Sequence, residues 1–534
     1  MKFRNYASLL FINLIIISIL VWIQSVPGYM DADYYYASAL RLFEGHGFTE
    51  IILWNYLDNP AGLPHPSHVY WMPLVSLVGA SGMLLFSTDA YLAARLGLVL
   101  MAVCVPVWVA YFSYQITSNV KYAYLSGLLA IFSGFYLPYI THTDSFALVM
   151  MIGLAFFWLI HEMQKQHNEK KLPILAMGLG VASGLMHLSR ADGVLWFFVS
   201  LLYLFWCWLK RKSKDQIPWF VGLFFSVLLG YLLVMGPWFW RNLQLFDSPF
   251  APGNLKTLWI TNYDELYSYP GSLLTPQRWM ASGWEKIIKD RLWALGLNLQ
   301  SLLAVQGEVF LFPFMLVGLW SYRKKSFVQV AILLWSLLFL LMSVVFPYAG
   351  ARGGFFHSGS ALQPLAWVMA PIGLDIVLEW AAKKRGWNIH QSRQVFYPAL
   401  VGMAILLSLI ILLGIRIDQT QSFLAWGNRH HLYVQAETVL QKSGANQEDI
   451  VMVNNPPGFY NANRRPAISI PYGDNSVLLE VAQRYQAKYL LLEFNQLLGS
   501  VDVYQNPSAV QQLNYLGKIG EVQIYKIETE DQSP

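Results

Sequence analysis

Two aspartates, Asp31 and Asp33, stand a few residues after the first long apolar segment of the chain, residues 8–23. Ionisable groups beside a membrane are functional candidates, because lipid makes it costly to keep a charge there. A carboxylate in this position can take a proton from a substrate or bind a metal ion. Asp31 could alternatively cap the helix that begins near Ala32, a role that does not exclude catalysis. Because Asp33 comes two positions later, the carboxylates converge only if that helix begins after Asp31.

Other residues capable of chemistry follow the ends of later apolar segments. They are His65 and His68 in PHPSH, Asp144 in THTDSF, Arg190 and Asp192 in SRADG, Arg241 in PWFWRN, and Arg352 and His357 in ARGGFFHS. Structural alternatives stay open: the histidines could be surface or structural groups, Asp144 could cap a helix, Arg190 could pair locally with Asp192, and Arg241 could anchor the membrane interface. Acids, imidazoles and guanidinium groups at helix ends favour an active site over a conduction path, which more often places such groups at mid-span.

The composition assigns the chain to the membrane proteins. Hydrophobic residues make up 56% of its 534 residues and charged residues 13%, whereas soluble domains carry about 25% charged residues. The net charge of +5 comes from short basic clusters between apolar segments, so we expect no nucleic-acid partner. Cys104 and Cys207 lie inside apolar segments and predict neither a disulfide framework nor a metal site. Walker, dinucleotide-binding, G-x-S-x-G and H-E-x-x-H motifs are absent from the sequence.

Segments of about 20 apolar residues are long enough to cross a bilayer. The sequence predicts eleven such spans, near 8–26, 91–115, 121–140, 144–163, 172–188, 192–209, 217–239, 298–322, 327–347, 360–381 and 395–417. Cytoplasmic loops are enriched in Lys and Arg, which places the clusters at 165–171, 210–214, 323–325 and 383–393 inside. Residues 70–87 are also apolar, but this orientation requires them to lie in the interface or to re-enter the outer leaflet.

The same orientation defines the predicted domains. The N-terminus is cytoplasmic and its first span is an uncleaved anchor, because no small-x-small cleavage site follows it. Residues 1–417 form a transmembrane domain with two large outer loops, 27–90 and 240–297. Residues 418–534 alternate strand-like and helix-like runs, which predicts a small extracytoplasmic α/β domain. The predicted fold class is therefore a polytopic α-helical protein of the plasma membrane, with about eleven spans and a C-terminal α/β domain.

The motifs resemble those of the membrane glycosyltransferases of the GT-C superfamily. An acidic motif after the first span, the segment HPSHVYWMPL and Arg95 in YLAARLGLVL carry the resemblance, together with THTDSF, SRADG and PWFWRN. This superfamily includes protein mannosyltransferases, aminoarabinose lipid A transferases and the catalytic subunits of oligosaccharyltransferases. The resemblance covers about residues 1–420, and the WWD-type acceptor signature of the oligosaccharyltransferases is absent.

The resemblance implies transfer of a sugar from a polyprenyl-phosphate donor to a protein, lipid or glycan acceptor outside the membrane. It implies that Asp31 or Asp33 is the general base and that Asp144 is a second acidic site residue. Guanidinium groups bind phosphate in a two-pronged geometry, so Arg190, Arg241 and Arg352 are candidates for the leaving phosphate. A shell of Asp31, Asp33 and Asp144 with His65 or His68 would suit Mg²⁺ or Mn²⁺ through its carboxylates and Zn²⁺ through its histidines, and the sequence leaves metal dependence open.

Two other classes of function compete with this hypothesis. A transporter or flippase of lipid-linked glycans would place its ionisable groups along a path through the bilayer. A receptor would bind its ligand through the outer α/β domain, but this leaves the acids of the first outer loop unexplained.

Overall fold

The computed structural model describes the chain except residues 167, 212–215, 415–422, 494–500 and 529–534. Its membrane domain and outer loops contain the helices α1 (Phe3–Ile23), α2 (Met30–Phe43), α3 (Leu74–Phe86), α4 (Tyr91–Thr117), α5 (Val120–Ile131), α6 (Phe146–Lys165), α7 (Leu172–Ser189), α8 (Val194–Lys210), α9 (Gln216–Phe246), α10 (Pro252–Lys256), α11 (Pro276–Ala281), α12 (Trp284–Gln300), α13 (Phe312–Ser321), α14 (Ser326–Leu340), α15 (Pro347–Ala349), α16 (Phe355–Ser360), α17 (Gln363–Arg385) and α18 (Ile389–Gly414).

The polytopic helical class is confirmed. Within the described residues, nine stretches of helix are long and apolar enough to cross a membrane, and they contain α1, α4, α6, α7, α8, α9, α14, α17 and α18. Two more predicted spans, 121–140 and 298–322, contain the shorter apolar helices α5 and α13. The last three residues of the predicted span 395–417 lie outside the described residues.

The prediction of one continuous span over 298–322 was wrong. The amphipathic helix α12 runs into a π-helical turn, Ser301–Gln306. Glu308 and Val309 then take positive φ angles of 43° and 58°, which no helix accommodates, and α13 starts afresh at Phe312. An average of hydropathy over a span does not reveal this interruption, because Gln306 and Glu308 stand among many apolar residues.

Residues 70–87 contain the short apolar helix α3, and their interfacial or re-entrant position stays a prediction. Helix α3 has 13 residues and ends at Ser87 in the left-handed conformation. At 1.5 Å per residue it is about 20 Å long, which is too short for a hydrocarbon core of about 30 Å. It packs on α2 and α4, so it supports the helix that carries the two aspartates.

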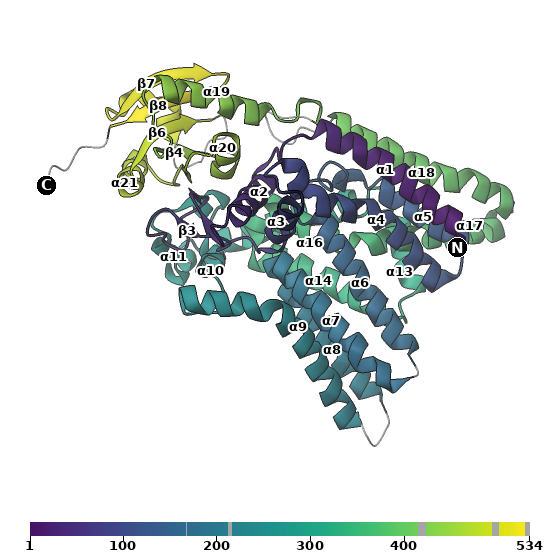
Figure 1. Cartoon of the computed structure of the whole chain (residues 1–534). Helices are drawn as coiled ribbons and strands as arrows, with labels where there is room; N and C mark the ends of the chain where they lie inside the picture. The colour runs from purple at the N-terminus through teal and green to yellow at the C-terminus, as the bar shows by residue number, and fades with distance from the viewer. Residues whose placement is uncertain (167, 212–215, 415–422, 494–500, 529–534) are drawn as a thin grey trace.

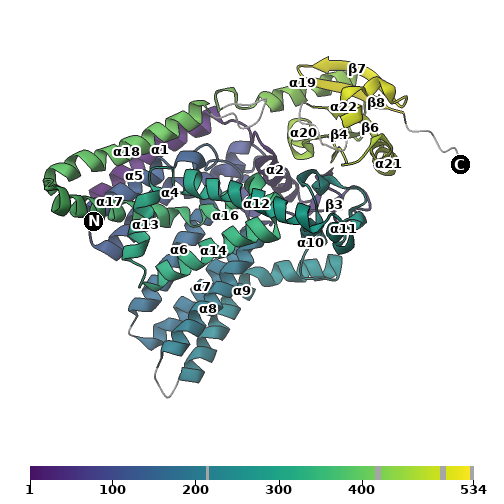
Figure 2. The same ribbon diagram turned by 180° about the vertical axis from the view of Figure 1, so that it is seen from behind.

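The C-terminal part is a small α/β domain, as predicted. It contains α19 (Asn428–Lys442), α20 (Pro456–Asn463), α21 (Asn475–Tyr485), α22 (Val501–Gln505), β4 (Ile450–Val453), β5 (Ala467–Ser469), β6 (Ala487–Leu492), β7 (Leu513–Ile519) and β8 (Val522–Ile527). The predicted boundary at 417/418 lies outside the described residues. In Figures 1 and 2 the domain lies beside α2, on the other side of the molecule from the far ends of α8 and α9.

The sheet of this domain also includes a strand of the first outer loop. Its order is β2-β5-β4-β6-β8-β7, and β2 (Ile52–Leu53) pairs in parallel with β5 through Ile52–Ala467 and Leu53–Ile468. The short strands β1 (Thr49–Glu50) and β3 (His65–Pro66) form a separate antiparallel pair. Backbone hydrogen bonds therefore connect the C-terminal domain to the loop that follows α2.

The turn between α1 and α2 requires glycine. Gly28 has φ of 85°, and a Cβ there would lie 2.5 Å from the Trp426 ring. The Trp426 indole N–H also donates to the Val26 carbonyl over 2.8 Å. The chain just before α19 thus closes over the turn that sets the direction of α2.

Candidate functional site

Asp31, Asp144 and His357 come from three separate segments and meet near the ends of helices. The His357 Nε2 atom lies 3.4 Å from Asp31 Oδ2 and 3.3 Å from Asp144 Oδ2. The Asp31 side chain is 31% exposed, that of His357 16% and that of Asp144 only 1%. The cluster therefore has one accessible carboxylate, supported from beneath by a buried carboxylate and an imidazole.

Helix α2 presents Asp31 from its first turn. The N-cap residue is Tyr29, so Asp31 is not the cap that the sequence left open. The helix already starts at Met30, and Asp31 and Asp33, two positions apart, point in different directions. The two aspartates of the motif therefore have different partners.

Asp144 and His357 are fixed by their own hydrogen bonds. Asp144 directly precedes the α6 N-cap Ser145, whose backbone N–H donates to Oδ1, and the Tyr29 hydroxyl donates to Oδ2 over 2.7 Å. The His357 Nδ1 atom lies 2.9 Å from the Gly353 carbonyl, which can only accept, so Nδ1 carries a proton. The imidazole also stacks on Phe146, with 4.5 Å between centroids. Nε2 is left facing the two carboxylates.

The three groups of the cluster shift one another's pKa. Desolvation raises the pKa of Asp31 to about 6, although His357 opposes the shift. Desolvation acts on Asp144 in the same direction, but His357, Tyr29 and the Ser145 N–H outweigh it and hold the pKa of Asp144 below its ordinary value. The two carboxylates likewise outweigh burial at the imidazole and raise the pKa of His357. These shifts favour the protonated form of His357 and the ionised form of Asp144.

The same three side chains could hold a metal ion. One ligand atom from each, two oxygens and a nitrogen, lie within 4.8 Å of one another. This mixed set suits Mn²⁺ or Zn²⁺ better than the all-oxygen shell that Mg²⁺ prefers. Asp33, which the sequence grouped with Asp31 and Asp144, is not part of this set.

Asp33 faces the C-terminal domain instead. Its side chain accepts hydrogen bonds from Asn455 and Asn461, each over 3.0 Å, and the residue is only 6% exposed. Desolvation raises the pKa of Asp33 to about 6 against the opposing effect of both amides. An acceptor hydroxyl could not approach this carboxylate without displacing an asparagine.

Two of the predicted arginines lie near the cluster. Arg190 forms the local ion pair with Asp192 over 2.9 Å, yet its charge still acts on both Asp31 and Asp144. Arg352 is exposed and lies over the Tyr263 ring at 5.2 Å. The charges of Asp31 and Arg352 both act on Tyr263, so all three side chains lie in the same region. Among the described residues, no carboxylate lies within ion-pair distance of Arg352.

The remaining predicted site residues lie elsewhere. His65 pairs with Asp58 over 2.7 Å. His68 is 1% exposed and lies 2.8 and 3.0 Å from the hydroxyls of Ser67 and Ser76, and burial lowers the pKa of His68 to about 3. Arg241 donates to the Ser67 carbonyl over 2.8 Å. These side chains hold the first outer loop together, and the structure does not bring them to the cluster.

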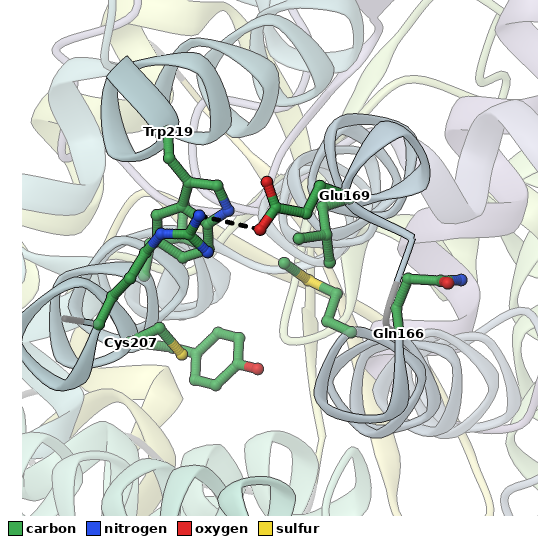
Figure 3. Close-up of a pocket in the computed structure, with 9 residues that line it drawn as sticks. Gln166, Glu169, Cys207 and Trp219 are labelled. Atoms are coloured by element: carbon green, nitrogen blue, oxygen red, sulfur yellow. Dashed lines mark hydrogen bonds and ion pairs between the residues drawn. The ribbon is translucent and has the colours of Figure 1, made fainter. Parts of the chain in front are cut away.

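A cavity lies at the opposite end of α6 from Asp144. Its volume is about 320 Å³, and residues near the ends of α6 and α8 and the starts of α7 and α9 line it (Figure 3). Glu169 and Arg211 form an ion pair there over 2.9 Å. The helices α6 and α7 separate this cavity from the cluster by their full length, so it is not part of the candidate site.

Sequence reasoning missed Tyr29, Asn455 and Asn461. Tyr29 directly precedes the helix of the acidic motif, and this position alone could have suggested it. The asparagines gave no signal, because Asn455 is separated from Asp33 by 422 positions.

Three solved structures share this fold over most or all of the chain. ArnT from Cupriavidus metallidurans bound to undecaprenyl phosphate matches 100% of both chains, with 12% identity and a TM-score of 0.58. The oligosaccharyltransferase AglB from Archaeoglobus fulgidus, in complex with an inhibitory peptide and a dolichol-phosphate, matches 100% of this chain and 75% of its own, with 13% identity and a TM-score of 0.56. The A. fulgidus enzyme in complex with Zn and sulfate matches 94% of this chain and 71% of its own, with 13% identity and a TM-score of 0.56.

No model of a known protein family matches the sequence, and no curated protein does. The structural matches agree with the resemblance found in the acidic and arginine motifs. The chain has the fold of the GT-C membrane glycosyltransferases.

Proposed function

We propose that the protein transfers a sugar from a polyprenyl-phosphate donor to an acceptor hydroxyl at the outer face of the membrane, with Asp31 as general base. The observation that carries the proposal is the cluster of Asp31, Asp144 and His357 at helix ends in a GT-C fold. Solved structures with this fold contain undecaprenyl phosphate or dolichol-phosphate, which supports a lipid-phosphate donor.

The reaction would proceed by direct displacement. An Asp31 oxygen accepts the proton of the acceptor hydroxyl while the hydroxyl oxygen attacks the anomeric carbon. The bond from this carbon to the phosphate oxygen breaks, its electron pair leaves with the polyprenyl phosphate, and the configuration inverts. His357 and Asp144 fix the orientation of Asp31, and a pKa of about 6 leaves most of the Asp31 carboxylate ionised at neutral pH.

Positive charge near the cluster would stabilise the leaving phosphate. Arg352 suits this role because it is exposed and lies over the Tyr263 ring, on which the charge of Asp31 also acts. Arg190 suits it less, because Asp192 already takes up part of its hydrogen-bonding capacity. Arg241 suits it least, because its guanidinium already donates to the Phe48 and Ser67 carbonyls of the first outer loop.

A divalent cation fits the cluster through Asp31, Asp144 and His357. When bound, it would supply positive charge beside the departing phosphate. Dialysis against EDTA, followed by addition of Mg²⁺, Mn²⁺ or Zn²⁺, separates the alternatives. Transfer that is lost and then restored assigns this charge to a metal, and transfer that is unaffected leaves it to the side chains near the cluster, Arg352 first among them.

Replacing the proposed base should abolish transfer. We expect Asp31→Asn to lower kcat by about 10²–10⁴-fold, because the amide cannot accept the proton. The measurement is transfer of a radiolabelled sugar from a polyprenyl-phosphate donor in membranes. Asp247→Asn is a suitable control, because Asp247 is exposed and its φ of 53° is one that asparagine tolerates. Wild-type turnover by a well-expressed Asp31→Asn variant would show that Asp31 is not the general base.

Replacing Arg352 should weaken the use of the donor more than the use of the acceptor. We expect Arg352→Ala to raise KM for the donor at least about tenfold and to leave KM for the acceptor within about twofold, because a charge-assisted phosphate contact is lost. Arg323→Ala is the matched control, since Arg323 lies over Trp320 at 4.4 Å in the loop between α13 and α14. An equal loss for both substrates would argue against a phosphate role.

A transporter or flippase of lipid-linked glycans is the alternative. It would need ionisable groups along the spans, whereas Asp31, Asp144 and His357 lie outside the nine candidate spans of the described chain. Purified protein in vesicles decides between them, since only the transferase releases free polyprenyl phosphate in step with glycosylated acceptor.

A further inference from the structure

The second aspartate of the acidic motif is part of an interface. Asn461 Nδ2 donates both to the Asp33 carbonyl over 2.9 Å and to Asp33 Oδ1 over 3.0 Å. Asn455 Nδ2 donates to Asp33 Oδ2 over 3.0 Å. Both asparagines belong to the start and middle of α20, so one short helix satisfies both carboxylate oxygens and a backbone carbonyl of α2.

Asn455 also organises α20 itself. It is the N-cap residue of this helix, and its Oδ1 atom accepts the Gly458 N–H over 3.1 Å. The side-chain oxygen of Asn455 therefore accepts a hydrogen bond from its own helix, while its nitrogen donates one to Asp33. A residue at this position must accept on one side and donate on the other.

The first turn of α2 is held from the opposite side by the membrane domain. The Thr143 hydroxyl donates to the Ala32 carbonyl over 2.7 Å, and Thr143 directly precedes Asp144. Consecutive carbonyls of the turn, those of Ala32 and Asp33, are thus bound by two different parts of the chain. Asp31 stands on this same turn, so its distance from His357 depends on both attachments.

We propose that Asn455 and Asn461 are positioning residues that set the orientation of Asp31 through Asp33, so that the C-terminal domain is a working part of the transferase site. This inference rests on the proposed function. Asp33 is then the point of attachment of α2 and takes no proton from the acceptor. Residues that orient a functional group without touching the substrate typically contribute about 10-fold to 100-fold to activity.

An exchange of the two side chains tests the proposal. In Asn455→Asp, two carboxylates face each other, although aspartate still caps α20 well. In Asp33→Asn, two amide nitrogens face each other. In the double variant Asp33→Asn/Asn455→Asp, the amide of residue 33 donates to the carboxylate of residue 455 and still accepts from Asn461. Both hydrogen bonds are then restored, and only the one between residues 33 and 455 is reversed in direction.

We expect each single variant to lose about 10-fold to 100-fold in kcat, with KM for the donor nearly unchanged, and the double variant to recover most of it. Asn463→Asp, on the same helix but bonded to the Tyr433 carbonyl, is the control and should keep wild-type kcat. A double variant that is inactive although its melting temperature has recovered would make Asp33 itself the base and overturn the proposal. Full kcat in Asn455→Asp would also overturn it.

The contact and the reaction can be tested separately. Melting temperatures of the wild type, the two single variants and the double variant form a double-mutant cycle that reports the Asp33–Asn455 contact without any substrate. Coupling in this cycle, together with a wild-type protein that transfers no sugar, would contradict the proposed function and leave the contact in place. Absence of coupling would contradict the contact itself.

Discussion

At the scale of single residues, one imidazole serves two unlike carboxylates. Asp144 is buried and hydrogen-bonded, so it stays ionised and orients His357. Asp31 keeps part of its surface exposed and has a raised pKa. Two acids with different environments can divide the roles of anchor and base. The second aspartate of the acidic motif, Asp33, is instead enclosed by the amides of Asn455 and Asn461.

The pH dependence of transfer should report the ionisation of Asp31. Its pKa in the folded protein is about 6, above the ordinary value of 3.8, so the base becomes protonated as the pH falls through 6. We expect kcat/KM for the acceptor to fall about tenfold per pH unit below this value. In His357→Gln the lowering effect of the imidazolium is removed, so the midpoint should move to higher pH. If the midpoint does not move, the group that titrates is not Asp31 beside His357.

At the scale of elements, short loops determine where the site side chains point. The left-handed turn at Gly28 sets the direction of α2, and the break at Gly350–Gly354, where Gly353 has φ of 118°, sets that of α16. Helix α3, too short to cross, fills the space beneath α2. The spans supply a rigid frame, and these turns bring Asp31 and His357 to the same place.

Replacing the first of these glycines should be costly. We expect Gly28→Ala to lower the free energy of unfolding by more than about 2 kcal/mol, because left-handed strain costs about 1–2 kcal/mol and a clash with Trp426 adds to it. Gly45→Ala is the matched control, since Gly45 has φ of 82° but a Cβ there would meet no atom within 4 Å. Thermal denaturation in detergent measures both, and equal losses would mean that Trp426 moves aside freely.

At the scale of the whole molecule, the C-terminal domain and the first outer loop form one unit. Strand β2 joins the domain's sheet, and Arg464 pairs with Glu44 and Asp89 over 3.0 and 2.7 Å. These exposed ion pairs contribute little by themselves. The backbone pairing and the two asparagines on Asp33 are the stronger link, and they place the domain on the same side of the membrane as the cluster.

The orientation of the chain gives a prediction for intact cells. The basic loops predict that residues 323–325 face the cytoplasm and that the C-terminal domain faces outward. In a Cys104→Ser/Cys207→Ser background, a membrane-impermeant maleimide should label Glu448→Cys in intact cells and Lys324→Cys only after permeabilisation. Both positions are exposed. The reverse pattern would place the cluster in the cytoplasm and contradict an outer-face reaction.

The sequence by itself determined the class of protein, the positions of most spans and the residue types of the site. Hydropathy and residue pattern are local properties, so they predicted most of the spans and the alternation of strands and helices in the C-terminal domain, although not strand β7. The interruption at Glu308 escaped prediction, because it depends on backbone angles and not on polarity. The sequence also selected Asp31, Asp144 and His357 among its candidates without distinguishing them from His65, His68 or Arg241.

Only the tertiary structure decided which of these residues meet. Asp144 and His357 are separated by 213 positions, and their contact depends on how whole helices pack. The different surroundings of Asp31 and Asp33 come from Asn455 and Asn461, which bind the Asp33 carboxylate, whereas the Asp31 carboxylate stays partly exposed. Neighbouring residues of one motif have nearly the same local sequence, so only the groups that surround each of them in the folded chain can set them apart.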